Sequence, residues 1–169
     1  SLPTRRSSDL CLLIPVAASA GPPTHLRAPP DLDSKVGIEQ KLGAQIPLDD
    51  AFRSVGNRVV HLRDLLNGKP IVLVPGYYGC INLCSVVRAG VANAVAGSGL
   101  VPGSQFNVVL VSIDPQENAR TAATTKANDA RVHAGAHVSS WHYLTGTGAA
   151  SKSLMRSIGY RYLYPPRNG

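Results

Sequence analysis

Two cysteines, Cys80 and Cys84, stand four positions apart, directly after an apolar run that predicts a buried strand over residues 70–77. We expect Cys80 at the turn from this strand into a helix and Cys84 one helical turn later, because residues four apart share a helix face. The positive end of a helix lowers the pKa of a thiol and favours the thiolate, the form that binds metals and attacks disulfides. Two such sulfur atoms can close a disulfide or hold one soft metal ion such as Cu(I).

Other interpretations of the pair stay open at this point. Two buried structural cysteines on a helix would have the same spacing. A structural zinc ion would need four cysteine or histidine ligands. The third cysteine is Cys11, near the N-terminus, and the histidines are scattered, so zinc is the weaker interpretation. The histidines are His25, His61, His133, His137 and His142.

Four further side chains belong to the predicted strands or their ends. Asp114 ends a second apolar run, where α/β folds place functional groups, and it could instead cap the next helix. Tyr77 and Tyr78 precede the cysteines and either shield the thiols or pack in the core. His142 lies in a short predicted strand, where we expect a packed or hydrogen-bonded side chain instead of a ligand.

The elements that must position these residues alternate between strands and helices. A hairpin is predicted first, over residues 51–61 around Gly56-Asn57. The strand over residues 70–77 lacks alternation, as a central strand buried on both faces should. A helix follows from residue 83 to the break at Gly97-Ser98-Gly99, and then a strand at 106–115. Residues 116–133 predict a helix, with Glu117 as its expected first residue. The last predicted elements are a strand at 141–145, a helix at 149–158 and a strand at 160–164. This order predicts an α/β fold with a mainly parallel central sheet, flanking helices and an N-terminal hairpin.

Length and composition fit one globular domain. The chain has 169 residues, 44% of them apolar and 16% charged. Its formal charge of +7 is spread along the sequence, without a basic cluster interleaved with aromatic residues, so nucleic-acid binding is not expected. A basic protein can also dock on an acidic partner or an anionic membrane surface, and composition alone does not choose between them.

The N-terminal residues predict a processed leader. Residues 1–10 resemble the translation of a sequencing adapter and are interpreted as non-native, the alternative being a native basic leader. Residues 11–20 end in Ala18-Ser19-Ala20 and are interpreted as the remnant of a signal peptide, too short to cross a bilayer; the alternative is an apolar segment packed on the domain. Residues 21–35 contain four prolines and predict a linker. Export would favour oxidation of nearby thiols.

Five blocks carry a resemblance to a known family: residues 36–49, 77–84, 111–117, 141–146 and 158–162. Over about residues 36–164 the chain resembles the Sco/SenC family of thioredoxin-like copper chaperones. The resemblance implies a thioredoxin-like domain over residues 36–169 whose C-terminal part is missing. It also implies a bacterial protein that is periplasmic or exported, free or tethered to the membrane.

The resemblance also implies a site and a task. Cys80 and Cys84 would bind copper, as Cu(I) or Cu(II), with a histidine expected beyond Gly169 as third ligand and Asp114 and Tyr78 as auxiliary residues. Ile81 replaces the proline that follows the first cysteine in the family. The implied task is copper delivery to the binuclear copper site of cytochrome c oxidase, with its copper-site subunit and other copper-handling proteins as partners. The alternative is a thiol-disulfide oxidoreductase, although reductases of this fold usually carry C-x-x-C; a metallochaperone is favoured over an enzyme.

Overall fold

Five strands form the central sheet of the computed structural model, which describes residues 31–80 and 82–164. Their order is β3-β2-β6-β5-β4. β4, β5 and β6 are parallel, whereas β2 is antiparallel to both β3 and β6. The bounds are Ala51–Arg53 (β2), Val59–His61 (β3), Ile71–Gly76 (β4), Asn107–Ser112 (β5) and His142–Gly146 (β6). The predicted α/β order and the N-terminal hairpin are confirmed.

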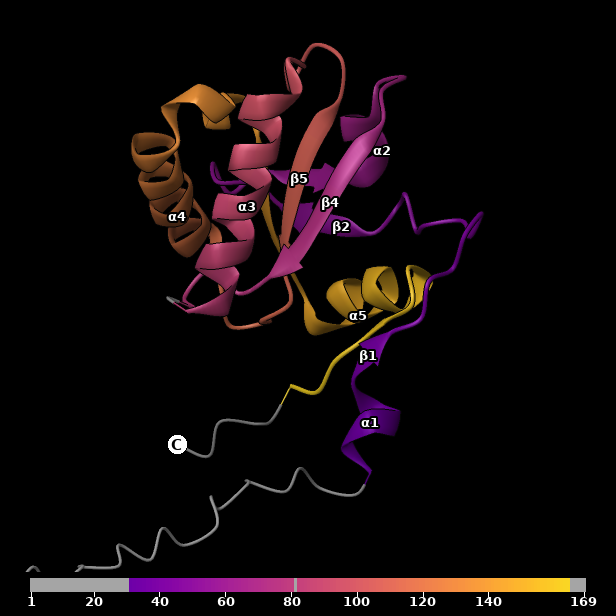
Figure 1. Cartoon of the computed structure of the whole chain (residues 1–169). Helices are drawn as coiled ribbons and strands as arrows, with labels where there is room; N and C mark the ends of the chain where they lie inside the picture. Colours follow the sequence, from indigo (N-terminus) through magenta and orange to yellow (C-terminus); the bar gives the residue numbers. More distant parts are fainter. Residues whose placement is uncertain (1–30, 81, 165–169) are drawn as a thin grey trace, which may run out of the picture. The chain divides into compact units, whose positions relative to one another are not determined.

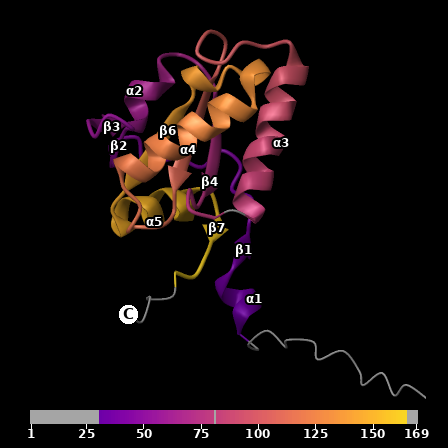
Figure 2. The ribbon, with the colours of Figure 1, turned by 90° about the vertical axis from the view of Figure 1, so that its left-hand side faces the viewer.

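Helices cover both faces of this sheet (Figures 1 and 2). β5 is buried throughout and its side chains alternate between the two sides. Val108 and Leu110 belong to the core cluster that includes residues of α3 and α4, whereas Val109 and Val111 belong to the cluster of α2 and α5. The bounds are Leu62–Leu66 (α2), Leu83–Ser98 (α3), Ala119–Val132 (α4) and Gly148–Ser157 (α5), with 3-10 turns at Ala134–Ala136 and Val138–Ser140.

The prediction that the strand after residue 70 is central was wrong. β4 lies at the edge of the five-stranded sheet, and Val72 is 41% exposed. An apolar run does not distinguish an edge strand from a central one. Pro75 did carry the distinction, because a proline has no N–H for a second strand and is confined to edges and bulges.

The last predicted strand also differs. β7 is limited to Tyr160–Arg161 and pairs antiparallel with β1, Gly37–Ile38, in a separate two-stranded sheet. Gly159 turns the chain into this strand with a φ of 76°, and a β-carbon there would collide with the Glu39 carbonyl. Residues 162–164 continue without strand pairing, so the prediction of a strand over 160–164 was too long.

Two further predictions concern the ends of elements. The helix expected to start at Glu117 begins at Ala119, because the Asn118 side chain accepts hydrogen bonds from the N–H groups of Arg120 and Thr121 and caps it. A short helix, α1 (Leu32–Lys35), occupies the end of the predicted linker. The interpretations of residues 1–10 and 11–20 lie outside the described residues. Within the described ranges, no helix is both long and apolar enough to cross a bilayer.

Candidate metal and thiol site

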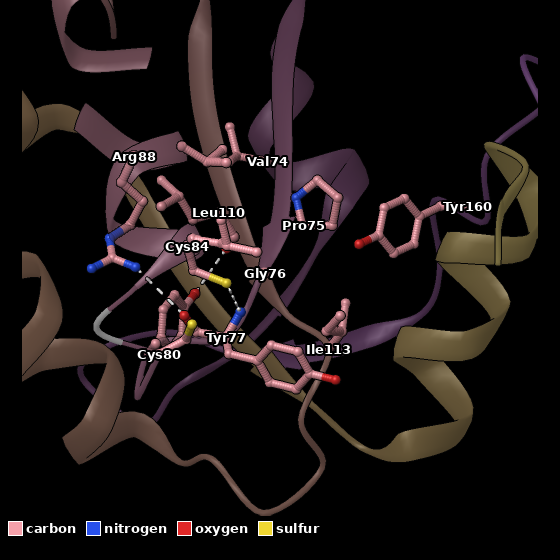
Figure 3. A pocket seen from close by; sticks show the side chains of 13 residues that line it. Val74, Pro75, Gly76, Tyr77, Cys80, Cys84, Arg88, Leu110, Ile113 and Tyr160 are labelled. Carbon is pink, nitrogen blue, oxygen red and sulfur yellow. Dashed lines mark hydrogen bonds between the residues drawn. The ribbon is translucent and has the colours of Figure 1, made fainter. Parts of the chain in front are cut away.

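The two cysteines lie where β4 gives way to α3 (Figure 3). Asn82 is the N-cap of α3, with non-helical backbone angles, so Cys80 lies in the loop before the helix and Cys84 in its first turn. Gly76, the last residue of β4, lies close to Cys84: a β-carbon built on it would be 3.6 Å from the Cys84 sulfur. Both thiols are free. The expected placement at a strand-to-helix turn is therefore confirmed, although only Cys84 is helical.

The start of α3 makes Cys80 the more acidic thiol. The backbone N–H groups of Cys84 and Asn82 and the thiol of Cys84 all hydrogen-bond to its sulfur and lower the pKa of Cys80. These donors stabilise the negative charge of the thiolate, as expected at the N-terminus of a helix. In this pair the Cys84 S–H donates and the Cys80 thiolate accepts.

Cys84 behaves in the opposite way. Burial raises the pKa of Cys84, and the neighbouring Cys80 adds to the rise, while the Tyr77 N–H and the charge of Arg88 oppose it. The Tyr77 N–H donates to the Cys84 sulfur at 3.4 Å. The sequence-based expectation that the helix start lowers both pKa values is thus correct for Cys80 and wrong for Cys84, where desolvation dominates.

Both sulfur atoms line one pocket of about 330 Å³ (Figure 3). Most of its wall is apolar, and it is closed on one side by the end of β4 and on another by the start of α3. Three apolar side chains in the first turns of α3 are largely exposed: Leu83 at 78%, Val86 at 68% and Val87 at 51%. The thiols therefore lie beside an exposed apolar surface. The pocket is lined by Val74, Pro75, Gly76, Tyr77, Tyr78, Cys80, Leu83, Cys84, Val87, Arg88, Leu110, Ile113 and Tyr160.

Arg88 lies one helical turn after Cys84 and was missed by sequence reasoning. Its Nε donates to the Asp129 carboxylate at 2.8 Å, and its Nη1 lies 3.5 Å from the Tyr77 carbonyl oxygen, to which it donates. Since the Tyr77 N–H faces the Cys84 sulfur, the same peptide segment contacts both side chains. The i, i+4 spacing from Cys84 was the signal that could have identified Arg88.

Glu117 was also missed as a site residue. Its carboxylate accepts hydrogen bonds from the backbone N–H groups of Tyr78 and Gly79, at 2.9 and 2.6 Å. These two residues immediately precede Cys80. Sequence reasoning assigned Glu117 only to the start of a helix, because nothing local pairs it with a loop 38 residues earlier.

The two residues expected to assist the site have different surroundings. Tyr78 is buried, and its hydroxyl lies within hydrogen-bonding distance of the carbonyl oxygens of Leu110 and Leu144. It therefore packs in the core and contributes to the pocket wall as well. Asp114 is 5% exposed, does not line the pocket, and accepts hydrogen bonds from the Gln116 N–H and the Tyr164 hydroxyl. Asp114 is not the cap of α4, since Asn118 is.

The described histidines lie away from the thiols. His142 starts β6 level with Val109, whereas the cysteines follow Gly76, which is level with Ser112 three residues further along β5. His61 precedes α2 and its ring contacts the Asp49 carbonyl oxygen. His133 and His137 flank a 3-10 turn, and His25 lies outside the described residues. Across residues 31–80 and 82–164, no group of three or more histidine, cysteine, aspartate or glutamate side chains could hold a metal ion.

The donor set formed by the two cysteines fits a soft monovalent ion. Thiolates select Cu(I) over hard cations, which prefer oxygen ligands. Within the described residues the protein supplies two sulfur atoms and no third donor of these types beside them. The arrangement can bind one Cu(I) between two thiolates or form a disulfide.

Comparison with solved structures gives the same fold. A protein from Aquifex aeolicus VF5, provisionally described as an electron transfer protein, is 22% identical, with 76% of this chain and 72% of that chain covered and a TM-score of 0.63. A SCO1/SenC family lipoprotein from Bacillus anthracis str. Ames is 18% identical, with 79% and 76% covered and a TM-score of 0.59. Copper-bound ScoI of Bradyrhizobium japonicum is 20% identical, with 74% of each chain covered and a TM-score of 0.51.

These likenesses confirm the predicted Sco/SenC-like fold, with its thioredoxin-like central sheet and flanking helices. At such low identity they establish the fold alone. No family model matches the chain. No curated protein matches it either.

Proposed function

We propose that this protein is a copper-binding metallochaperone for the binuclear copper site of cytochrome c oxidase, with Cys80 and Cys84 as thiolate ligands. The observation that carries the proposal is the meeting of two free, hydrogen-bonded thiols in one pocket at the start of α3. The Sco-like fold supports it, because copper-bound ScoI of Bradyrhizobium japonicum has the same fold.

The protonation of the pair sets the first step. The lowered pKa of Cys80 makes it the thiol that loses its proton first, whereas the raised pKa of Cys84 means that its proton is lost only when a metal competes for the sulfur. Metal binding therefore releases a proton from Cys84. The resulting bis-thiolate complex of Cu(I) would carry one negative charge, beside the Arg88 guanidinium, whose charge lowers the pKa of Cys84 and is shared with Asp129. A third ligand, the histidine expected beyond Gly169, would come from outside the described residues.

The surroundings of the thiols support the proposed partners, and a protein of the same fold supports the proposed location. Leu83, Val86 and Val87 offer an exposed apolar surface beside the sulfur atoms, suited to transient contact with the copper-site subunit of the oxidase or another copper-handling protein. Tyr78 and Asp114 act as auxiliary residues by fixing the core and the β5–α4 loop near the thiols. The proposed location is periplasmic or exported, with a membrane tether as an option; the lipoprotein of the same fold from Bacillus anthracis supports export and tethering.

A competition titration tests the proposal. The full chain is prepared with Cys11→Ser, so that only the proposed ligands carry thiols. The protein is then reduced and titrated with Cu(I) in competition with a chromophoric chelator. We expect one equivalent to bind. Changing only the hydrogen-bond partner of a metal ligand weakens metal binding by about 10–100-fold. Because Cys80→Ser and Cys84→Ser each remove a ligand itself, each should weaken Cu(I) binding by more than that. No binding, or binding undiminished by Cys84→Ser, would refute the copper proposal.

A second candidate function, thiol-disulfide exchange, is favoured by the opposite pKa shifts of the two cysteines. In that reaction the Cys80 thiolate attacks one sulfur of a partner disulfide, and the other partner sulfur leaves as a thiolate. Cys84, deprotonated, then attacks Cys80 in the mixed disulfide and releases the second partner thiol. The pair is oxidised by two electrons and the partner is reduced. Trapping a mixed disulfide with Cys84→Ser, in a protein that does not bind Cu(I), would favour this function.

A further inference from the structure

The Glu117 side chain links the loop that carries Cys80 to the C-terminal end of β5. This loop, residues 77–80, is called the thiol loop below. Its Oε2 accepts from the Tyr78 N–H at 2.9 Å and its Oε1 from the Gly79 N–H at 2.6 Å. A carboxylate that accepts two N–H bonds from consecutive residues restrains both peptide units at once. Bonds to a charged acceptor are about twice as strong as those between neutral groups.

The carboxylate is itself held in place. The hydroxyl of Ser112, a fully buried residue at the end of β5, donates to Glu117 Oε2 at 2.6 Å. The same hydroxyl accepts from the Asp114 N–H at 3.1 Å. Glu117 also donates its own N–H to the Asp114 carbonyl at 3.2 Å. Hydrogen bonds therefore run without a break from Ser112 in the sheet, through the Glu117 carboxylate, to Tyr78 and Gly79 in the loop; we call this arrangement the Glu117 clamp.

The restrained segment is the one that sets the position of Cys80. The backbone ladder between β4 and β5 ends with the Ile113 N–H donating to the Gly76 carbonyl. Beyond that bond, the Glu117 carboxylate accepts the next backbone N–H groups, those of Tyr78 and Gly79, while the Tyr78 hydroxyl reaches the Leu110 carbonyl of β5. Gly79 lies close enough that a β-carbon would be 3.4 Å from Glu117 Oε1. Cys80 is the next residue, whereas Cys84 is fixed separately by α3.

We propose that Glu117 is a positioning residue for the thiol pair: by clamping the peptide groups of Tyr78 and Gly79, it sets where the Cys80 sulfur lies relative to that of Cys84. The inference rests on the proposed use of the two thiols, in copper binding or in exchange. Loss of the clamp leaves each cysteine intact and makes their joint action, on one metal ion or in one disulfide, less favourable.

The test compares Glu117→Ala and Glu117→Gln with Asn118→Ala, in the full chain carrying Cys11→Ser. Asn118→Ala is the matched control, because it removes two side-chain-to-backbone hydrogen bonds at the adjacent position without touching the thiol loop. Three quantities are measured: the Cu(I) affinity, the equilibrium of the Cys80–Cys84 disulfide with glutathione, and the midpoint of thermal unfolding.

We expect Glu117→Ala to weaken Cu(I) binding by about tenfold or more, and to shift the equilibrium with glutathione by about as much from the Cys80–Cys84 disulfide towards the reduced thiols. Glu117→Gln should fall between, since its amide oxygen can accept one N–H while its amide nitrogen faces the other. Asn118→Ala should lower the unfolding midpoint and leave both thiol readouts within about twofold, because helix capping acts on stability alone.

A Glu117→Ala protein that loses stability like the control but keeps both thiol readouts would overturn the inference. If Glu117→Ala does not fold, Ser112→Ala decides instead: it removes the hydroxyl that holds the carboxylate, and unchanged thiol readouts there would also overturn it. Failure of the wild-type chain to bind Cu(I) would refute the copper proposal, while the glutathione equilibrium would still test Glu117.

Discussion

Arg88 and Asp129 form a largely buried ion pair, with 2.8 Å between Nε and Oδ2 and side chains only 11% and 12% exposed. The Tyr143 hydroxyl donates to the same carboxylate oxygen at 2.8 Å. The pair ties α3, which carries Cys84, to α4, and Tyr143 extends the link to β6. Because Arg88 lies one turn after Cys84, the pair joins the part of α3 that carries Cys84 to α4.

Breaking this ion pair should be costly. Asp129→Asn leaves the Arg88 guanidinium without its counter-charge in a largely buried position, and we expect a loss of about 3 kcal/mol in the free energy of unfolding. Urea denaturation measures it. Asp49→Asn is the control, since the Arg63–Asp49 pair is exposed and its loss should cost at most about 1 kcal/mol. Equal losses in the two variants would contradict the role assigned to the buried pair.

The two thiols should differ in reactivity. Iodoacetamide alkylates thiolates, so limiting reagent near neutral pH should modify Cys80 before Cys84, whose pKa is raised by burial. Peptide mapping by mass spectrometry after short reaction times measures the ratio. In urea-unfolded protein the two cysteines should react at similar rates. Faster modification of Cys84 in the folded protein would show that the opposed pKa shifts are wrong.

His142 should make the protein less stable in mild acid. Burial lowers the pKa of His142 below its ordinary 6.5, and the charge of Lys126 adds to the effect. As the pH falls, His142 of the unfolded chain therefore binds a proton near pH 6.5, whereas His142 of the folded protein binds one only at lower pH. The free energy of unfolding is therefore highest above about pH 6.5 and decreases as the pH falls below it.

Denaturation at several pH values tests this effect. The free energy of unfolding should decline as the pH falls below about 6.5, and His142→Asn should reduce that decline. His137→Asn is the control, since His137 is exposed and an asparagine tolerates its positive φ of 51°. An identical decline in wild type and His142→Asn would contradict the prediction.

Local sequence patterns predicted the order of elements well. The turn around Gly56-Asn57, the end of α3 before Gly99 and the start of a helix after Cys80 all depend on residues close in sequence, and all are present. The thiol pair was identified for the same reason. Its spacing and its place after an apolar strand are visible without any tertiary contact.

Contacts between distant residues were not predictable. Glu117 reaches a loop 38 residues earlier, and Arg88 pairs with Asp129 across 41 residues. Each of these side chains is an ordinary surface residue in a sequence pattern. The packing of α3 against α4 gives Arg88 its partner, and the pairing of β4 with β5 brings Glu117 beside the loop that carries Cys80. The edge position of β4 belongs to the same class, although Pro75 marked it.

X-ray absorption at the copper K-edge identifies which atoms of the protein bind Cu(I). The reduced full chain, with Cys11→Ser, is loaded with one equivalent of Cu(I), and the ligand atoms around the metal are identified. We expect copper to be bound by two sulfur atoms, from Cys80 and Cys84, and Cys84→Ser to remove one of them. Coordination by nitrogen and oxygen alone, or a sulfur count unchanged by Cys84→Ser, would contradict it.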